Sequence, residues 1–276
     1  MKKWFAVIGN PIGHSLSPFM HDSWFQEQNI DATYIPIQVE EGELEEAVNA
    51  LKQLGCCGWN VTVPYKEAII PFLDEIDSSA TGIGAVNTVV KTKDGRFVGY
   101  NTDGLGFVQS LGPIIQDNKI LLLGAGGAAR GILHAFKQLG YLNIVIANRT
   151  YANAQKLVQE LQYGQAMTLQ NAEACLGQFD IIVQTTPQGM KNNTDTLPIQ
   201  LNHIKNHAIV ADIVYNPLVT PFLEEAKKYE VRSINGLGML VHQGAIAFSY
   251  WIGQMPNTDR MVERLTEQLG GNYVNR

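Results

Sequence analysis

Residues 119–150 read KILLLGAGGAARGILHAFKQLGYLNIVIANRT, and this stretch decides the fold. Two β-rich apolar runs, KILLL at 119–123 and NIVIA at 143–147, flank a glycine-rich turn and a helical pattern. Apolar residues recur in that pattern at helical spacing, at Ile132, Leu133, Phe136 and Leu139. Gly140 then stands where helices commonly end on a glycine. The stretch therefore predicts a strand, a helix and a second strand, the unit from which α/β folds are built.

Similar β-rich runs recur outside this unit: WFAVI at 4–8, WNVTV at 59–63, DIIVQ at 180–184 and AIVADIV at 208–214. Between about residues 119 and 214 they alternate with helical segments, which predicts a Rossmann-like, doubly wound parallel sheet buried on both faces. The chain from Gly238 onward is helical in pattern. We therefore expect an N-terminal α/β domain at 1–103, a nucleotide-binding domain at 104–237 and C-terminal helices at 238–276 that return to the first domain.

The composition is that of a folded globular protein. Of 276 residues, 45% are hydrophobic and 17% charged, and this length suits two domains. A net charge of -6 gives no electrostatic reason to approach nucleic acid or an anionic membrane. No apolar stretch approaches the roughly 18 residues that a membrane helix needs, so we expect a cytoplasmic protein. The cysteines, Cys56, Cys57 and Cys175, have neither disulfide-framework nor metal-ligand spacing, and we expect no metal.

The glycine-rich turn carries the G-x-G-x-x-A pattern of a dinucleotide site. Gly124 lets the chain turn sharply, Gly126 lets the backbone approach a pyrophosphate, and Ala129 keeps the helix close to the strand. The helix N-terminus supplies N–H donors and positive potential. We therefore expect contacts to a dinucleotide from this turn, at Gly124, Ala125, Gly126, Gly127 and Ala128.

The end of the second strand indicates which dinucleotide binds. An NAD site usually has Asp or Glu there to accept a hydrogen bond from the ribose 2′-hydroxyl, whereas this chain has Asn148, Arg149 and Thr150. Arg149 offers a guanidinium to a 2′-phosphate, with two neutral donors beside it. This pattern favours NADP. The alternative is that Arg149 is an ordinary solvated surface arginine.

Five further motifs occur in order along the chain: GNPIGHSLSP at 9–18, NVTVPYK at 60–66, GAVNT at 84–88, NTDG at 101–104 and HQGA at 242–245. This ordered set resembles the signature of the shikimate dehydrogenase family over nearly the whole chain. The resemblance implies an NADP-dependent oxidoreductase that interconverts 3-dehydroshikimate and shikimate on the chorismate route to the aromatic amino acids. It also implies a small-molecule substrate and a monomer or homodimer, with residues 1–103 as the substrate-binding and catalytic domain.

The resemblance assigns roles residue by residue. Ser15 and Ser17 bind the substrate carboxylate, although Ser17 followed by Pro18 is also a good helix N-cap. Further substrate contacts are implied for Thr62, Asn87, Asp103, Tyr215 and Gln243. Three residues resemble positions that line the nicotinamide, namely Ile213, Gly236 and Met239. Each of these, taken alone, also fits a purely structural role.

Lys66 and Asp103 carry the chemistry in the family pattern. Oxidation of a secondary alcohol requires a proton acceptor at the hydroxyl, and the reverse reaction requires a donor at the carbonyl oxygen. A lysine can do both, and a neighbouring Asp103 would favour its charged form. Which of the two is the proximate base in oxidation stays open. The alternative for Lys66 is a surface lysine that begins a helix over KEAIIPFL.

Two other functions fit parts of the pattern. A quinate/shikimate dehydrogenase would share the motifs with broader substrate or cofactor use, but Ser15 and Arg149 argue against it. A non-catalytic NADP-binding sensor would be expected to have lost the Lys66 and Asp103 pair. Because the proposed substrate residues lie before 104 and after 242 with the cofactor motif between them, we expect the substrate in a cleft between the two domains.

Overall fold

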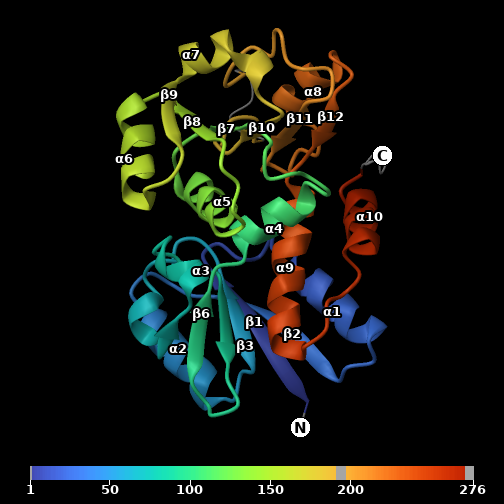
Figure 1. Cartoon of the computed structure of the whole chain (residues 1–276). Helices are drawn as coiled ribbons and strands as arrows, with labels where there is room; N and C mark the ends of the chain where they lie inside the picture. Colours follow the sequence, from blue (N-terminus) through green and yellow to red (C-terminus); the bar gives the residue numbers. More distant parts are fainter. Residues whose placement is uncertain (1, 191–196, 271–276) are drawn as a thin grey trace. The chain divides into compact units, whose positions relative to one another are not determined.

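The computed structural model describes residues 2–190 and 197–270, which fall into two compact units. Unit 1 comprises the described part of Met1–Thr102 together with Gln243–Met261, and unit 2 the described part of Asp103–His242 and Val262–Arg276. Each unit contains a six-stranded sheet (Figure 1). The division passes through helix α9 (Leu237–Ile252), whereas the sequence-based boundary lies next to the first residue of that helix.

Unit 1 is built on a mixed sheet with the strand order β2-β1-β3-β5-β6-β4. Its strands are β1 (Lys3–Gly9), β2 (Ala32–Gln38), β3 (Gly58–Val61), β4 (Glu75–Ile76), β5 (Thr88–Lys91) and β6 (Phe97–Tyr100). β1 pairs in parallel with β2 and β3, whereas β5 is antiparallel to both β3 and β6. The runs expected at 4–8 and 59–63 are thus confirmed as strands. The other four strands were not predicted.

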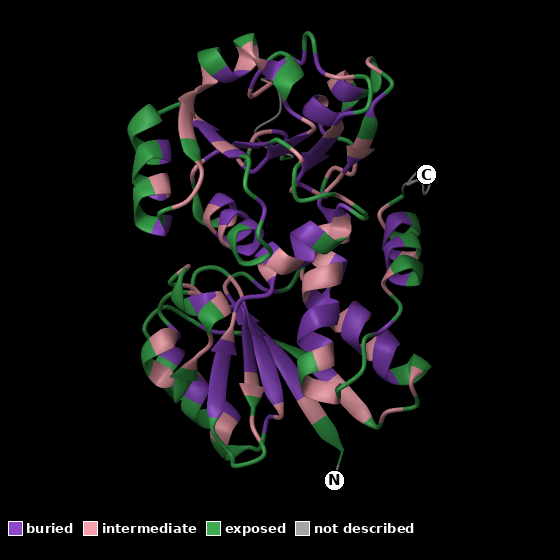
Figure 2. Ribbon diagram, viewed as in Figure 1, coloured by how far each residue is buried: buried purple, intermediate pink, exposed green. Residues whose placement is uncertain are grey.

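Helices cover both faces of the unit 1 sheet. They are α1 (Ser17–Glu27), α2 (Leu44–Gln53), α3 (Ser78–Thr81) and part of α9, with a 3-10 turn η1 (Ile70–Phe72). Ala6 of β1 lies in one buried cluster with Val48 of α2 and Trp59 of β3. The neighbouring residue Phe5 instead stacks on Phe25 of α1, because successive strand residues point to opposite faces. Figure 2 shows the resulting band of buried residues along the strands.

Unit 2 is built on an entirely parallel sheet with the order β12-β11-β10-β7-β8-β9. Its strands are β7 (Ile120–Leu123), β8 (Ile144–Asn148), β9 (Gln165–Thr168), β10 (Ile181–Gln184), β11 (Ile209–Asp212) and β12 (Arg232–Ile234). Its helical segments are α4 (Asp103–Ser110), α5 (Gly127–Gln138), α6 (Tyr151–Leu161), α7 (Leu169–Ala174), η2 (Leu176–Gln178), α8 (Pro221–Lys227) and α10 (Thr258–Gln268), of which α10 begins in unit 1. The expected doubly wound, Rossmann-like fold is confirmed.

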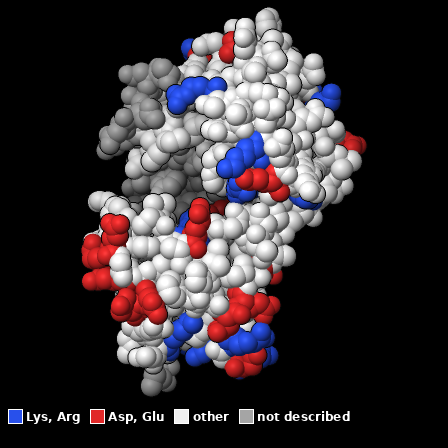
Figure 3. All heavy atoms as spheres, turned by 90° about the vertical axis from the view of Figure 1, so that its left-hand side faces the viewer, with Lys and Arg blue, Asp and Glu red and all other residues white. Residues whose placement is uncertain are grey.

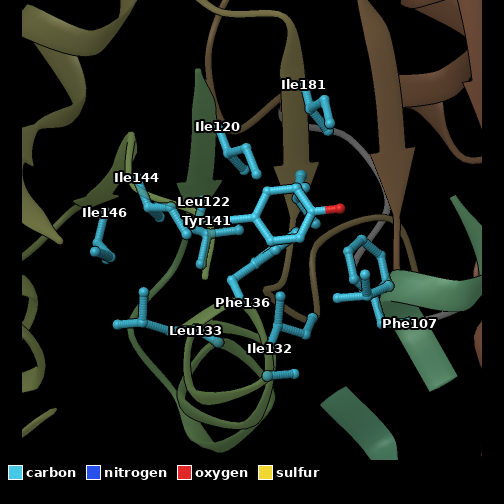
Figure 4. Packing of buried hydrophobic residues seen from close by; sticks show 14 of the residues in the cluster. Phe107, Ile120, Leu122, Ile132, Leu133, Phe136, Tyr141, Ile144, Ile146 and Ile181 are labelled. Carbon is cyan, nitrogen blue, oxygen red and sulfur yellow. The ribbon is translucent and has the colours of Figure 1, made fainter. Parts of the chain in front are cut away.

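The parallel sheet is buried on both faces, as its apolar strands predict. Ile120 and Leu122 of β7 lie in one cluster, whereas the alternate residues Leu121 and Leu123 lie in a second cluster. Figure 4 shows the first cluster, in which Phe136 of α5 packs among strand residues. Each such aliphatic side chain stabilises the fold by roughly 1.5–3 kcal/mol relative to an exposed position. Across the described chain, no helix has the length and apolar character required to span a bilayer.

Candidate active site

The glycine-rich turn after β7 has the geometry of a phosphate-binding loop. Gly124 has φ +118°, and a Cβ there would lie 2.5 Å from Oγ1 of Thr185, so both the turn and the packing require glycine. Gly126 and Gly127 are exposed, and a Cβ on either would meet nothing within 4 Å. Helix α5 begins at Gly127 without a side-chain cap. An uncapped helix N-terminus beside two exposed glycines is the kind of site at which proteins bind a pyrophosphate.

The end of β8 places polar groups where a dinucleotide ribose would lie. Asn148 is the last residue of β8, and its Nδ2 donates to the carbonyl of Thr150 at 2.9 Å. Arg149 and Thr150 are exposed. On the face shown in Figure 3, acidic and basic groups are interspersed without an extended basic surface. A phosphate bound to such a surface depends on local donors, and the residues at this strand end can supply them.

The residues predicted to line the nicotinamide lie close together within unit 2. Ile213 and Met239 pack at the margin of the same buried cluster as Ala125 of the glycine-rich turn. The N–H of Gly236 donates to the carbonyl of Val214 at 3.0 Å, and a Cβ on Gly236 would overlap the backbone carbonyl of Ile213. Glycine is therefore required at 236 by backbone packing. Tyr215 is half-buried, and burial raises the pKa of its phenol, which stays neutral.

Asp212 is a residue that the sequence analysis missed. It ends β11, is fully buried, and accepts hydrogen bonds from the N–H of Val214 at 3.0 Å and from Oγ1 of Thr220 at 2.7 Å. Burial raises the pKa of its carboxyl to about 6, although both hydrogen bonds act in the opposite direction. Asp212 thus braces the loop that contains Tyr215. Its only signal in the sequence is an acidic residue inside the apolar run AIVADIV.

In unit 1, the two predicted substrate serines are neighbours at the start of α1. The N–H of Ser17 donates to Oγ of Ser15 at 3.2 Å. Helix α1 includes Ser17, its cap position is Leu16, and no side chain caps it. The alternative that Ser17 is the N-cap is therefore wrong. Burial raises the pKa of the nearby Tyr34 well above its ordinary value, and Ser17 acts on that pKa in the opposite direction.

The structure also brings together residues that are distant in the sequence and were predicted to bind the substrate. Nδ2 of Asn87 lies 3.4 Å from Oε1 of Gln243, which is 156 residues away. Asn87 is buried, and Gln243 is partly buried. Thr62 follows β3, and a Cβ on Gly9 would overlap its methyl group. The first glycine of the GNPIGHSLSP motif thus makes room for another predicted substrate residue.

Lys66 lies in a series of turns that follows β3. Its carbonyl accepts from the N–H of Val86 at 2.8 Å, and the hydroxyl of the preceding Tyr65 donates to the carbonyl of Val39 at 2.7 Å. These bonds hold the backbone at Lys66 in place. The alternative that Lys66 begins a helix over KEAIIPFL is wrong, because only η1 forms there and Pro71 cannot occupy the interior of an α-helix.

Asp103 is the first residue of α4 and is half-buried. The next residue, Gly104, is the glycine of the NTDG motif, and helix packing explains why it is a glycine. A Cβ on Gly104 would overlap the backbone carbonyl of Gly131, so α4 and α5 approach each other closely. Because Lys66 belongs to unit 1 and Asp103 to unit 2, their pairing stays a prediction. No group of three or more potential metal ligands is found within residues 2–190 and 197–270.

Comparison with known proteins gives the same family along the chain. The profile described as the shikimate dehydrogenase substrate binding domain matches residues 7–89, and that described as shikimate / quinate 5-dehydrogenase matches 107–240. A shikimate 5′-dehydrogenase C-terminal domain matches 236–266. A protein of Lysinibacillus sphaericus named shikimate dehydrogenase (NADP(+)) is 55% identical, with 99% of this chain and 100% of that protein covered.

Solved structures give the same picture. Shikimate 5-dehydrogenase from Listeria monocytogenes, in complex with shikimate and NAD, has a TM-score of 0.89 at 34% identity and covers 96% of both chains. The enzyme from Thermus thermophilus, in complex with NADP(H) and shikimate, has a TM-score of 0.86 at 33% identity and covers 96% of this chain and 99% of that chain. Since the profiles, the relatives and the fold all agree with the five motifs, the chain belongs to the shikimate dehydrogenase family.

Proposed function

We propose that this chain catalyses the reversible, NADP-dependent reduction of 3-dehydroshikimate to shikimate. The observation that carries the proposal is 55% identity, over 99% of the chain, to a protein named shikimate dehydrogenase (NADP(+)). The described residues fit such a cofactor, because α5 begins uncapped beside open glycines and Arg149 follows β8 on the surface. When bound, the nicotinamide ring supplies the hydride acceptor or donor.

Lys66 is the proposed general acid and base, paired with Asp103. In the oxidative direction Lys66 accepts the proton of the hydroxyl that is being oxidised, and in the reductive direction it returns a proton to the carbonyl oxygen. Its backbone is held on both sides by the bonds of Tyr65 and Val86, which limits where its ammonium can reach. Asp103 would favour the charged form of Lys66 and bind the same hydroxyl, so the two groups titrate as one coupled site.

The remaining residues bind and orient the substrate. Ser15 and Ser17 donate to its carboxylate from the start of α1, whereas Thr62, Asn87 and Gln243 bind its ring hydroxyls. Tyr215 approaches the substrate as a neutral phenol, since burial raises its pKa. The brace that Asp212 provides keeps the backbone beside Tyr215 in place.

The test is direct: purified protein is mixed with shikimate and either NADP or NAD, and the absorbance of the reduced nicotinamide is followed. We expect rapid reduction of NADP with shikimate and little turnover of quinate. Equal turnover of quinate would favour a quinate/shikimate dehydrogenase, and binding of NADP without any turnover would favour a sensor. The cytoplasmic location and the oligomeric state stay predictions.

Cofactor preference should depend steeply on Arg149. Family members often carry a second basic residue four positions after this arginine, but here the position is Asn153, which is exposed in the first turn of α6. Arg149 must then supply most of the charge at a 2′-phosphate. We expect Arg149→Ala to reduce the ratio of kcat/KM for NADP to that for NAD by roughly 10- to 100-fold, and Asn153→Arg to raise it.

Both effects should shrink with added salt, because an exposed guanidinium-phosphate contact is screened over about 8–10 Å at ordinary ionic strength. The measurement is kcat/KM for each cofactor in the parent and both variants at low and high salt. Exposed Lys93, on unit 1, offers a control, because Lys93→Ala also removes one surface cation. An unchanged ratio in Arg149→Ala would mean that other residues recognise the 2′-phosphate or that none does.

The two serines should affect the substrate and not the cofactor. The double variant Ser15→Ala, Ser17→Ala removes both hydroxyls proposed to bind the carboxylate, and hydrogen bonds to a charged group contribute roughly 1.5–3 kcal/mol each. We therefore expect KM for shikimate to rise at least tenfold, with KM for NADP nearly unchanged. Similar increases in both KM values would point to a damaged fold, which a thermal melt would reveal.

A further inference from the structure

Unit 1 contains a continuous network of buried polar side chains. Its members have relative exposures of 3% for Tyr34, 7% for Asn60, 3% for Asn87, 0% for Thr88 and 1% for Thr102. They come from β2, β3, β5 and the segments on either side of the β5-β6 hairpin. Buried polar groups are costly unless they are hydrogen-bonded, so the arrangement of donors and acceptors in this network is constrained.

One backbone donor fixes the orientation of the Asn87 amide. The N–H of Thr102 lies 2.9 Å from one amide atom of Asn87, and because an N–H can only donate, that atom is the oxygen Oδ1. The other amide atom is therefore Nδ2, a donor. It lies 3.0 Å from Oγ1 of Thr102 and 3.4 Å from Oε1 of Gln243. Asn87 thus directs its donor side toward Gln243.

Three further side chains support this orientation. Nδ2 of Asn60 donates to the backbone carbonyl of Asn87 and to Oγ1 of Thr88, each at 3.0 Å. The Thr88 hydroxyl, which accepts from Asn60, donates its own proton to Oδ1 of Asn87 at 2.9 Å. Oδ1 of Asn60 accepts from the hydroxyl of Tyr34 at 2.6 Å. Each side chain in this series therefore donates to the next: Tyr34 to Asn60, Asn60 to Thr88, and Thr88 to Asn87.

The other end of the network is the phenol of Tyr34, which donates to Asn60. Ser17 lies near this end of the network, where it lowers the pKa of Tyr34 against the larger effect of burial. Burial raises the pKa of Tyr34 well above its ordinary value, so the phenol keeps the proton that it donates. The network thus connects Tyr34 to Asn87 and Gln243, two residues that the proposed function assigns to the substrate.

We propose that Tyr34, Asn60 and Thr88 are positioning residues that hold the Asn87 amide with its donor toward Gln243, so that the site recognises acceptor oxygens of a ring hydroxyl. This inference rests on the proposed function. Rotating the amide by half a turn would place its NH2 group against the N–H of Thr102 and remove the acceptor of the Thr88 hydroxyl. The network therefore selects one of two amide orientations that have nearly the same shape.

The test removes the hydroxyl of Thr88, which is hydrogen-bonded to Oδ1 of Asn87. Thr88→Val removes the proton donated to Oδ1 of Asn87, and Thr88→Ser retains it. Thr266→Val is a matched control, since Thr266 is also buried and its hydroxyl donates within α10 of unit 2, to the carbonyl of Val262 at 2.7 Å. Tyr34→Phe tests the far end of the network. For each variant, KM for shikimate, KM for NADP and kcat are measured, together with a thermal melt.

A positioning role predicts a rise of about three- to tenfold in KM for shikimate in Thr88→Val and a smaller rise in Tyr34→Phe. KM for NADP should stay unchanged, and Thr88→Ser should restore the parent value. The control should lose stability without a selective change in KM. Equal changes in both KM values, or a lower melting temperature with no change in KM for shikimate, would show that the network only stabilises the fold. Either result would overturn the proposal.

Failure of this inference is distinguishable from failure of the proposed function. If the parent protein does not reduce NADP with shikimate, the proposed function is wrong and no variant is needed. If the parent is active and Thr88→Val has the parent KM for shikimate, only the positioning role is wrong.

Discussion

Lys66→Ala is expected to turn over shikimate about 10²- to 10⁴-fold more slowly than the parent protein, with little change in KM for shikimate. The physical reason is that Lys66 is proposed to act on a proton that moves only in the transition state, so its loss affects kcat far more than binding. The measurement is steady-state kinetics in both directions. Asp103→Asn should lower kcat and raise KM together, since Asp103 is proposed both to bind the hydroxyl and to influence Lys66.

Two controls separate proton transfer from charge. Lys66→Arg retains a cation that does not give up its proton at ordinary pH, so it should be nearly as slow as Lys66→Ala. Lys93→Ala, at an exposed position of unit 1, should keep the parental kcat. A near-normal kcat in Lys66→Ala would exclude Lys66 as the general acid and base and leave Asp103 as the candidate.

The second large effect is on stability in acid, and it comes from His21. This side chain is fully buried, stacks on Tyr34 at 4.3 Å between ring centroids, and has no hydrogen-bond partner for either nitrogen among the described residues. Burial lowers its pKa from 6.5 to about 3. In the unfolded chain the imidazole takes up a proton below pH 6.5, whereas in the folded protein it stays neutral down to about pH 3.

Because the unfolded state binds the extra proton, the stability that His21 supports is fully present above pH 6.5 and falls as the pH falls toward 3. The slope is about 1.4 kcal/mol per pH unit, so between pH 6.5 and 4.5 His21 should remove roughly 2–3 kcal/mol from the free energy of unfolding. Urea unfolding across this range measures it. His21→Phe should lose correspondingly less stability over the same interval.

The matched control is His14→Gln, because the side chain of His14 is exposed. Its unfolding free energy should follow the parent over the whole range. If His21→Phe and the parent lost the same stability between pH 6.5 and 4.5, the imidazole would be protonated in the folded state and its burial would carry no penalty.

The fold was predictable where the deciding pattern is local. The strand, turn and helix of residues 119–150 follow one another, so periodicity and glycine positions suffice to predict β7, α5 and β8. The strands β2, β5 and β6 were missed for a physical reason. β2 contains Pro36 and lies at the sheet edge, where a missing N–H is tolerated, and β5 and β6 have four residues each. They are stabilised by distant pairing, β2 with β1, β5 with β3, and β6 with β5.

In the candidate site, too, residues in local motifs could be predicted, and residues whose roles depend on distant contacts could not. Motif residues such as Lys66 and Asn87 could be selected from the sequence, because they stand in short ordered patterns. Ser17 was open to interpretation as an N-cap, and the local pattern could not reveal that the helix begins one residue earlier, with Leu16 at the cap position. Asp212 and Thr88 were missed because their roles depend on a loop that turns back and on a contact across strands.

The return of the chain to unit 1 affects the order in which the protein folds during synthesis. Trp251 of α9 stacks on Phe5 at 4.9 Å between ring centroids and donates from Nε1 to the carbonyl of Val89 at 3.0 Å. The cluster of unit 2 in Figure 4 is drawn from residues 107–234 alone. During synthesis, all residues of this unit 2 cluster are therefore made before Trp251 of unit 1, although N-terminal domains generally fold first. Nascent chains that end before Trp251 therefore lack the ring that stacks on Phe5 and the donor to the carbonyl of Val89.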